Sequence, residues 1–190
     1  AKYLFFDPAE YKAFTQTIGG FRGEYQGGYE QGIDPHPYVD DDGTKYMFWV
    51  DSTGSDRLCV VKMDTWLKPD WTTAKALLYH SFYTVEDLEK SQNGEAVEFV
   101  SYALESVSIN EGPQVIKHNG KYYLQYACPG TEYNTYADGV YVADHPLGPY
   151  ALQASNPFSS KPGGLIAGAG HGSTIEDRHG NFWHAATMRI

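Results

Sequence analysis

The sequence predicts an all-β protein, and three observations support that prediction. Aromatic residues make up 15% of the 190 residues, including 16 Tyr, and such residues favour pleated strands. The 20 glycines favour turns, and long amphipathic helical patterns are nearly absent. One pattern, a strand followed by a glycine-containing turn and an aromatic strand, occurs three times. Repetition of one such unit indicates sheets arranged radially, as the blades of a β-propeller are.

The first repeat unit follows a stretch without a clear pattern. Residues 1–32 predict a short strand over 4–6 and then a loop broken by paired glycines. A strand then leads into the acidic Asp-Asp-Asp-Gly turn at 40–43 and on to an aromatic strand that ends at Val50. This turn is expected to be solvated. Further strands are expected at 57–63 and 74–79, and four antiparallel strands within ~50 residues amount to one blade.

A short helix and an irregular stretch separate the first unit from the second. Residues 84–90 predict the helix, with Thr84 as its N-cap, and residues 97–107 predict a loop or weak strand. The second unit centres on a hairpin with an Asn-Gly turn at 119–120. Its strands are expected at 113–118, 121–128, 139–143 and weakly at 150–153.

The third unit repeats the hairpin over residues 168–188, close to the end of the chain. The repeat units therefore cover about 30–80, 110–155 and 168–190, which is two and a half to three blades. We expect the whole chain, 1–190, to be a partial catalytic propeller domain. The remaining blades are expected from other parts of the same protein or from another copy.

Composition limits the class of partner. The net charge of −10 and the pI near 5.0 argue against a nucleic acid, because a polyanion is bound by basic patches. No run of about 18 apolar residues is present, so no membrane span is expected. Cys59 and Cys128 lie in apolar strand segments, which favours buried free thiols over a disulfide. Neutral or weakly charged ligands fit this composition best.

Three side chains that are distant in the sequence are expected to converge. Asp34, Glu111 and His171 stand at the entrance of the innermost strand of each unit, next to Pro or Gly. In a radial arrangement these entrances face the same end of the central channel. Two carboxylates across a sugar-sized cleft are the groups that glycoside hydrolysis requires. The other histidines, His36, His118, His145, His179 and His184, are assigned no role.

The motifs around these residues resemble those of the family 43 glycoside hydrolases, which are five-bladed β-propellers. Residues 33–35 with 40–44 are similar to the second acidic motif, and residues 111–113 with 119–124 to the general-acid motif. Residues 142–150 resemble the strand and turn that follow, and residues 170–173 the axial histidine motif. The resemblance covers roughly residues 30–187.

The resemblance implies a role for each converging residue. Glu111 is expected to be the general acid, and Asp34 to raise its pKa and orient it. His171 is expected near the axis, beside a structural calcium ion that it contacts directly or through water; no cofactor is needed for catalysis. The family's water-activating base is an Asp-Pro aspartate further upstream. The upstream pair here, Asp7-Pro8, lies too close to Asp34, since a blade takes ~40–50 residues. The base is therefore expected outside this chain.

The resemblance implies an inverting glycoside hydrolase that cleaves arabinose- or xylose-containing plant polysaccharides or oligosaccharides. Two alternatives remain open. One is a non-catalytic carbohydrate-binding propeller, and the other is a related five-bladed propeller enzyme acting on fructans or mannosides. The first residues lack the regions of a signal peptide, so a mature secreted protein and a cytoplasmic one would look alike. With a polysaccharide substrate we expect a secreted or periplasmic location.

Overall fold

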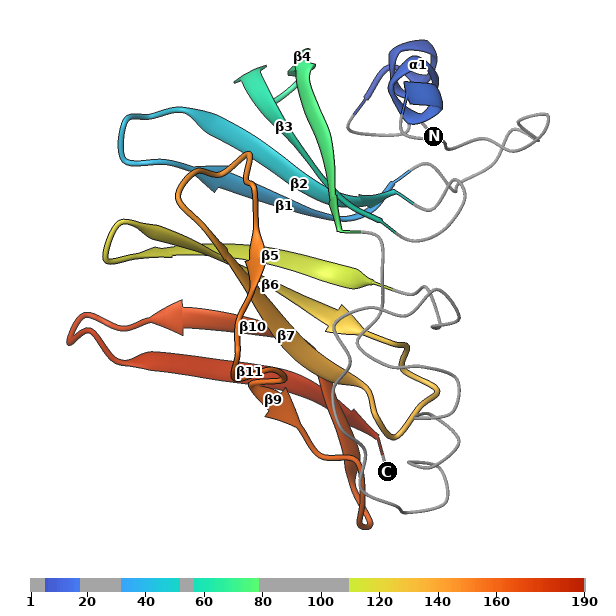
Figure 1. Cartoon of the computed structure of the whole chain (residues 1–190), viewed down its shortest axis with the longest axis vertical. Coiled ribbons are helices and arrows are strands. Elements are labelled where there is room, and N and C mark those ends of the chain that lie inside the picture. Colours follow the sequence, from blue (N-terminus) through green and yellow to red (C-terminus); the bar gives the residue numbers. More distant parts are fainter. Residues whose placement is uncertain (1–5, 18–31, 52–56, 79–109, 190) are drawn as a thin grey trace.

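In the part of the chain that the computed structural model describes, three antiparallel sheets lie side by side, with one helix beside the first sheet (Figure 1). The structure describes residues 6–17, 32–51, 57–78 and 110–189. The predicted helix at 84–90, the irregular stretch at 97–107 and most of the strand at 4–6 lie outside these residues. None of the described helical segments is long and apolar enough to cross a membrane.

The first sheet has four strands in the order of the chain, as predicted. Its strands are β1 (Ile33–Val39), β2 (Lys45–Asp51), β3 (Arg57–Thr65) and β4 (Lys68–Leu78). β4 begins well before the predicted start at residue 74. Pro69 lies at its second position, opposite Met63, and an edge strand tolerates a proline because one side of its backbone needs no ladder partner.

The second and third sheets contain the other two predicted hairpins. Their strands are β5 (Glu111–His118), β6 (Lys121–Cys128), β7 (Ala137–Ala143), β8 (Ala151–Leu152), β9 (Ser159–Ser160), β10 (Ala167–Glu176) and β11 (Phe182–Arg189). The β5–β6 turn has positive φ at both Asn119 and Gly120, 48° and 73°. Those angles belong to a two-residue type I′ turn, whose twist matches that of the strands.

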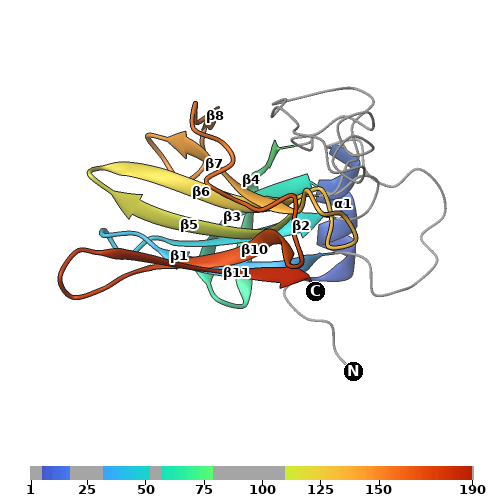
Figure 2. The same cartoon turned by 90° about the horizontal axis from the view of Figure 1, so that it is seen from below.

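The first and second sheets pack against each other through apolar side chains. Figure 2 shows the three sheets from below. The main core cluster combines residues of β2 and β3 with residues of β5 and β6, and among its fully buried members are Phe48, Leu58 and Leu124. The second and third sheets are joined by Gln114, whose amide bonds both backbone groups of Thr174 at 2.9 and 2.7 Å. These contacts confirm an all-β fold of neighbouring blades.

Neither cysteine forms a disulfide, and both are buried, as expected. Cys128 belongs to the core cluster between the first two sheets. Cys59 belongs to a second cluster on the other face of the first sheet. The first sheet therefore separates the two thiols.

The N-terminal segment differs from the structure that the sequence predicts. A helix, α1 (Pro8–Thr17), occupies part of the region expected to be loop. Asp7 caps it, since its Oδ1 accepts hydrogen bonds from the backbone N–H groups of Ala9 (2.9 Å) and Glu10 (3.2 Å). Pro8 takes the first helical position, where its missing N–H costs nothing. The Asp-Pro pair was therefore a helix-start signal.

α1 covers the face of the first sheet that the second sheet leaves open. Its residues Tyr11 and Phe14 are buried against Trp49 and Trp71. The Tyr11 hydroxyl donates a 2.8 Å hydrogen bond to Asp51 and accepts one of 3.1 Å from the Trp49 ring nitrogen. Tertiary packing of aromatic rings therefore holds a helix with little amphipathic pattern of its own.

Candidate active site

The first strands of the three sheets are neighbours: β1 packs against β5, and β5 packs against β10. Each of them carries a bulge near its start, where the register with the second strand of its sheet shifts. In the bulges that correspond between the units, at 33/36, 111/114 and 170/173, one residue has a left-handed backbone: Asp34 (φ 51°), Gly112 (φ 57°) and His171 (φ 50°). β10 has a further shift at 168/170, where Ala169 has φ of 106°. The repeats are thus equivalent down to the backbone conformation at the strand entrance.

The expectation that the three site residues occupy equivalent positions is wrong for Glu111. Asp34 and His171 do occupy the same position, but in the second unit that position belongs to Gly112. Glu111 is one residue earlier and is the first residue of β5, paired with Ala127, rather than lying before the strand. A Cβ on Gly112 would lie 2.8 Å from the His171 ring, so only glycine leaves room for the imidazole.

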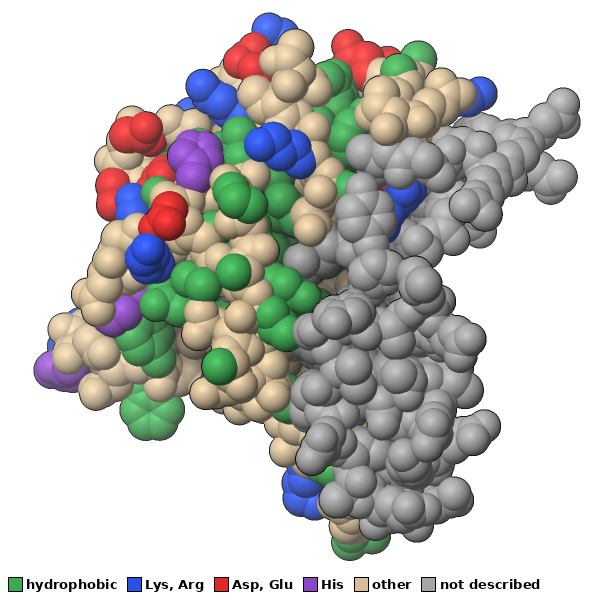
Figure 3. Space-filling view, in the orientation of Figure 1, with side chains coloured by type: hydrophobic (Ala, Val, Ile, Leu, Met, Phe, Trp, Pro, Cys, Tyr) green, Lys and Arg blue, Asp and Glu red, His purple; other side chains and the backbone are tan. Residues whose placement is uncertain are grey.

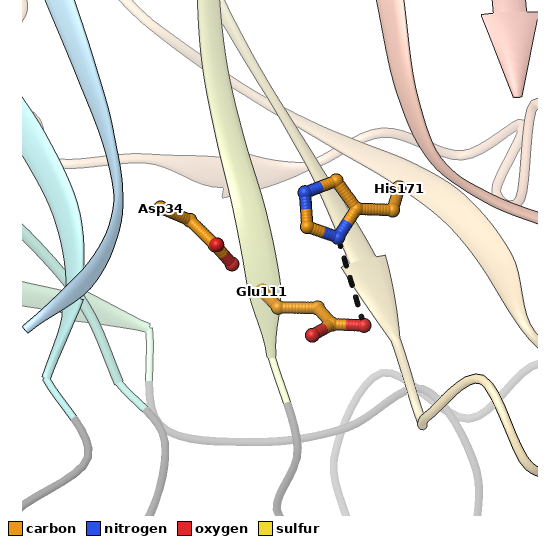
Figure 4. Close-up of side chains that lie close together, drawn as sticks. All are labelled: Asp34, Glu111 and His171. Atoms are coloured by element: carbon orange, nitrogen blue, oxygen red, sulfur yellow. Dashed lines mark ion pairs between the residues drawn. The ribbon is translucent and has the colours of Figure 1, made fainter. Parts of the chain in front are cut away.

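The structure brings Asp34, Glu111 and His171 together, with one ligand-type atom of each within 4.8 Å of the others (Figure 4). Asp34 Oδ2 accepts a 3.0 Å hydrogen bond from the Gly112 N–H. Glu111 Oε1 lies 3.8 Å from His171 Nδ1, and it also accepts a hydrogen bond from the Tyr136 hydroxyl. Tyr136 was missed by the sequence analysis because no predicted element included it.

Burial and neighbouring groups act in opposite directions on Glu111. Burial raises the pKa of the Glu111 carboxyl, but His171 and the Tyr136 hydroxyl together bring that pKa below its usual value. The Glu111 carboxylate in turn raises the pKa of His171, with burial opposing it. The distance of 3.8 Å is too long for a hydrogen bond, and the two groups form an ion pair when His171 is protonated. In the free site Glu111 is therefore held as a carboxylate.

The ligands that a calcium ion requires can be compared with the donor atoms of this cluster. Asp34, Glu111 and His171 are the one group of three or more metal-ligating side chains within the described ranges. Calcium takes six to eight oxygen ligands, and this cluster supplies two carboxylates and one imidazole. The donor set fits a hydrated cation, with water completing the shell, rather than an ion held by protein atoms alone.

The acidic turn between β1 and β2 differs from the expected solvated turn at one residue. Asp41 and Asp42 are exposed, but Asp40 faces the second sheet. It accepts hydrogen bonds from Lys117 Nζ at 2.7 Å and from the Tyr122 hydroxyl at 2.5 Å. These contacts lower the pKa of Asp40 against the effect of burial. Asp40 thus ties the first two sheets together.

The sheets are arranged radially, and the entrances of their inner strands bring two carboxylates and an imidazole together. This arrangement defines a β-propeller with an acidic site near its axis. The model of the glycosyl hydrolases family 43 matches residues 13–189. A xylan 1,3-β-xylosidase from a Vibrio species is 27% identical over 166 residues. The chain therefore belongs to glycosyl hydrolase family 43.

Solved structures agree with this assignment. An endo-1,4-β-xylanase from Bacteroides thetaiotaomicron superposes with a TM-score of 0.63 over 86% of this chain, at 24% identity, which shows the fold. A thermostable family-43 glycoside hydrolase matches 82% of the chain with a TM-score of 0.58 at 28% identity. The chain spans 51% and 47% of these two proteins. Of the Vibrio xylosidase it spans 27%, and that match covers 84% of this chain.

Proposed function

We propose that this chain forms part of an inverting glycoside hydrolase that acts on xylose-containing polysaccharides or oligosaccharides, with arabinose-containing ones as the second substrate class. The observation that carries the proposal is the convergence of Asp34 and Glu111 at neighbouring strand entrances in a family 43 chain. The xylosidase and xylanase names of the relatives favour xylose as the sugar.

In this proposal Glu111 donates the proton to the leaving oxygen. Its side chain is one-fifth exposed, so the carboxyl is reachable yet largely out of water. Asp34 supports it indirectly, because its carboxylate holds the Gly112 N–H next to Glu111 and adds negative charge beside it. The base that activates water lies on a further segment, about 6.5–9.5 Å from Glu111 as inversion requires.

A general acid must be protonated, whereas the free site lowers the pKa of Glu111. Substrate binding reverses this balance in our proposal. A sugar over the site excludes water from Glu111, and desolvation raises a carboxyl pKa. The Asp34 carboxylate acts in the same direction. Protonation of Glu111 is then coupled to substrate binding.

We infer that the chain works within a complete ring of blades. Among the described residues the third sheet has two strands, β10 and β11, and its apolar side chains Ile175 and Trp183 are each 62% exposed. Figure 3 shows further hydrophobic side chains gathered near the middle of one face of the molecule. Apolar patches on a sheet with an open edge are normally covered by neighbouring strands.

We also propose a hydrated calcium ion beside His171 and a secreted or periplasmic location.

A substrate panel with product analysis tests this proposal. The full-length protein that carries these residues is incubated with xylan, arabinan and their oligosaccharides, and the first product anomer is identified by NMR. Release of xylose-containing products with inverted configuration is the expected result. Binding without turnover would instead favour the carbohydrate-binding alternative, and turnover of fructans or mannosides the related-enzyme alternative. A product of retained configuration would contradict inversion.

A further inference from the structure

The entrance of β7 contacts Glu111 and the strand that carries His171. Tyr136 and Asp138 stand two residues apart there, so their side chains point to the same side of the chain. Tyr136 is 1% exposed and Asp138 is fully buried. Neither belongs to a motif that the sequence analysis identified. Each one contacts the strand entrances that carry the site.

Tyr136 contacts both Glu111 and the strand that carries His171. Its hydroxyl donates a hydrogen bond to Glu111 Oε1. Its ring lies against Gly170, where an added Cβ would be 2.7 Å from ring atoms. The ring therefore fixes the direction from which the hydroxyl reaches the Glu111 carboxyl.

Asp138 holds the backbone on the other side of His171. Its Oδ2 accepts a 2.9 Å hydrogen bond from the Gly172 N–H and lies 3.0 Å from His184 Nε2. A Cβ on Gly172 would be 2.3 Å from that same oxygen. Gly170 and Gly172 are thus glycine because Tyr136 and Asp138 occupy the space on either side of His171. This accounts for the Gly-His-Gly spacing.

A closed set of hydrogen bonds surrounds Gly172. His184 Nδ1 is 2.8 Å from the Thr174 hydroxyl, which donates a 2.6 Å bond to Gln125 Oε1. Gln125 Nε2 then donates a 2.6 Å bond to the Gly172 carbonyl. Both backbone groups of Gly172 are held, one through Asp138 and the other through Gln125. Such a network over-determines the backbone, which lets His171 keep its left-handed φ of 50°.

We propose that Tyr136 and Asp138 are positioning residues of the active site. Tyr136 orients the Glu111 carboxyl toward the leaving oxygen, and Asp138 holds the backbone that places the His171 imidazole against Gly112. The proposal rests on the proposed function, because it assigns both residues to the general acid step. Each residue acts through Glu111 or His171 rather than on the sugar itself. A misplaced acid loses catalytic efficiency even when it remains chemically intact.

Tyr136→Phe is the decisive variant, since it removes the hydroxyl and keeps the ring against Gly170. We expect kcat/KM for a xylo-oligosaccharide to fall about 10-fold or more, a part of the 10²–10⁴ that general acid catalysis supplies. KM should change little. For a dinitrophenyl xyloside, whose leaving group needs little protonation, the loss should stay under about 3-fold. Tyr150→Phe is the matched control, because it also loses a hydroxyl hydrogen bond, to the Pro146 carbonyl, outside the site.

Asp138 is tested by a pair of variants. Asp138→Asn keeps an oxygen that can accept from the Gly172 N–H and should retain most of kcat, whereas Asp138→Ala should lose it. Melting temperatures are measured for all variants, and Asp138→Asn and Tyr136→Phe stay informative if Asp138→Ala fails to fold. Asp138→Asn as impaired as the alanine variant would overturn the assignment of Asp138.

Equal losses on the two substrates in Tyr136→Phe, or no loss on either, would overturn the assignment of Tyr136. Failure of the proposed function looks different. In that case the wild-type protein turns over neither substrate, or Glu111→Gln retains full activity, and the positioning proposal falls with it. If the wild type is active and Glu111→Gln is not, the Tyr136 and Asp138 results bear on positioning alone.

Discussion

The imidazole of His171 lies against Gly112, where any Cβ would come within 2.8 Å of the ring. This contact joins the third sheet to the second at the point where Glu111 enters β5. It explains why the acid stands one residue before the position that Asp34 and His171 occupy in their own units. The glycine is required both for its backbone, with φ of 57°, and for the space above it.

Gly112→Ala should therefore damage the site more than it damages the fold. The left-handed backbone alone costs about 1–2 kcal/mol for a residue with a Cβ. Gly120→Ala is the matched control, since Gly120 has φ of 73° and nothing within 4 Å of an added Cβ. We expect similar losses of stability in urea unfolding, with a large loss of kcat in Gly112→Ala alone. Equal kcat in the two variants would contradict a role for the His171 position.

Glu111→Gln tests the general acid itself. The amide keeps the size of the side chain but cannot donate the proton, so turnover of unactivated xylosides should fall by about 10²–10⁴. Turnover of a dinitrophenyl xyloside should fall less, and binding of xylo-oligosaccharides, measured by calorimetry, should be nearly unchanged. Equal losses on both kinds of substrate would show that Glu111 is not the acid.

We expect the free energy of unfolding to depend on pH through the buried carboxyl of Asp138. Burial raises the pKa of this carboxyl to about 7 from an ordinary value of 3.8. The native state therefore takes up the proton more readily than the unfolded state. The resulting stabilisation is fully present below pH 3.8 and is lost as the pH rises through about 7.

The comparison with Asp138→Asn isolates this effect. The free energy of unfolding of wild type minus that of Asp138→Asn should fall between pH 4 and 7, by about 4 kcal/mol at most, from 1.36 kcal/mol per unit. His184, whose pKa burial lowers, titrates in both variants. A difference that is independent of pH, or that rises with pH, would contradict the prediction.

Calcium removal tests the hydrated ion proposed beside His171. Dialysis against a chelator should lower the melting temperature by several degrees, because a ligand bound only to the native state stabilises it. Added calcium should restore the wild type but have no effect on His171→Ala. Magnesium is the control cation, since it demands a tighter octahedral shell. An unchanged melting temperature, with no calcium found by elemental analysis, would remove the ion from the proposal.

The 190 residues by themselves are expected to show no glycosidase activity. The water-activating base is expected outside them, and Asp7 serves as the cap of α1. The segment is purified alone and assayed on xylan, arabinan and aryl glycosides, with the full-length protein as the positive control. Its oligomeric state is measured by light scattering, and association is expected. Robust turnover by a monomeric segment would mean that an acid within this chain is the base.

The sequence by itself determined most of the strands and identified Asp34, Glu111 and His171 as the side chains to examine. It did not predict β9, and it placed the start of β4 too late. Hairpins depend on neighbouring residues, because an Asn-Gly pair selects a turn and alternating aromatic residues select a strand. Asp34, Glu111 and His171 could be found in this way, since each stands at or next to the same place in a local pattern that repeats. The helix α1 was missed although its Asp7-Pro8 start was visible, because packing against Trp49 rather than helical periodicity stabilises it.

Only the tertiary structure decided how the site is assembled. The bulge that moves Glu111 one residue away from the repeat position depends on pairing with β6 and on the His171 ring from another sheet. Tyr136 and Asp138 reach the site from β7, in a segment whose local sequence carries no motif. Contacts between sheets join residues that are far apart along the chain, and their geometry follows from how the blades pack. Local sequence patterns do not encode that packing, and the structure therefore had to supply it.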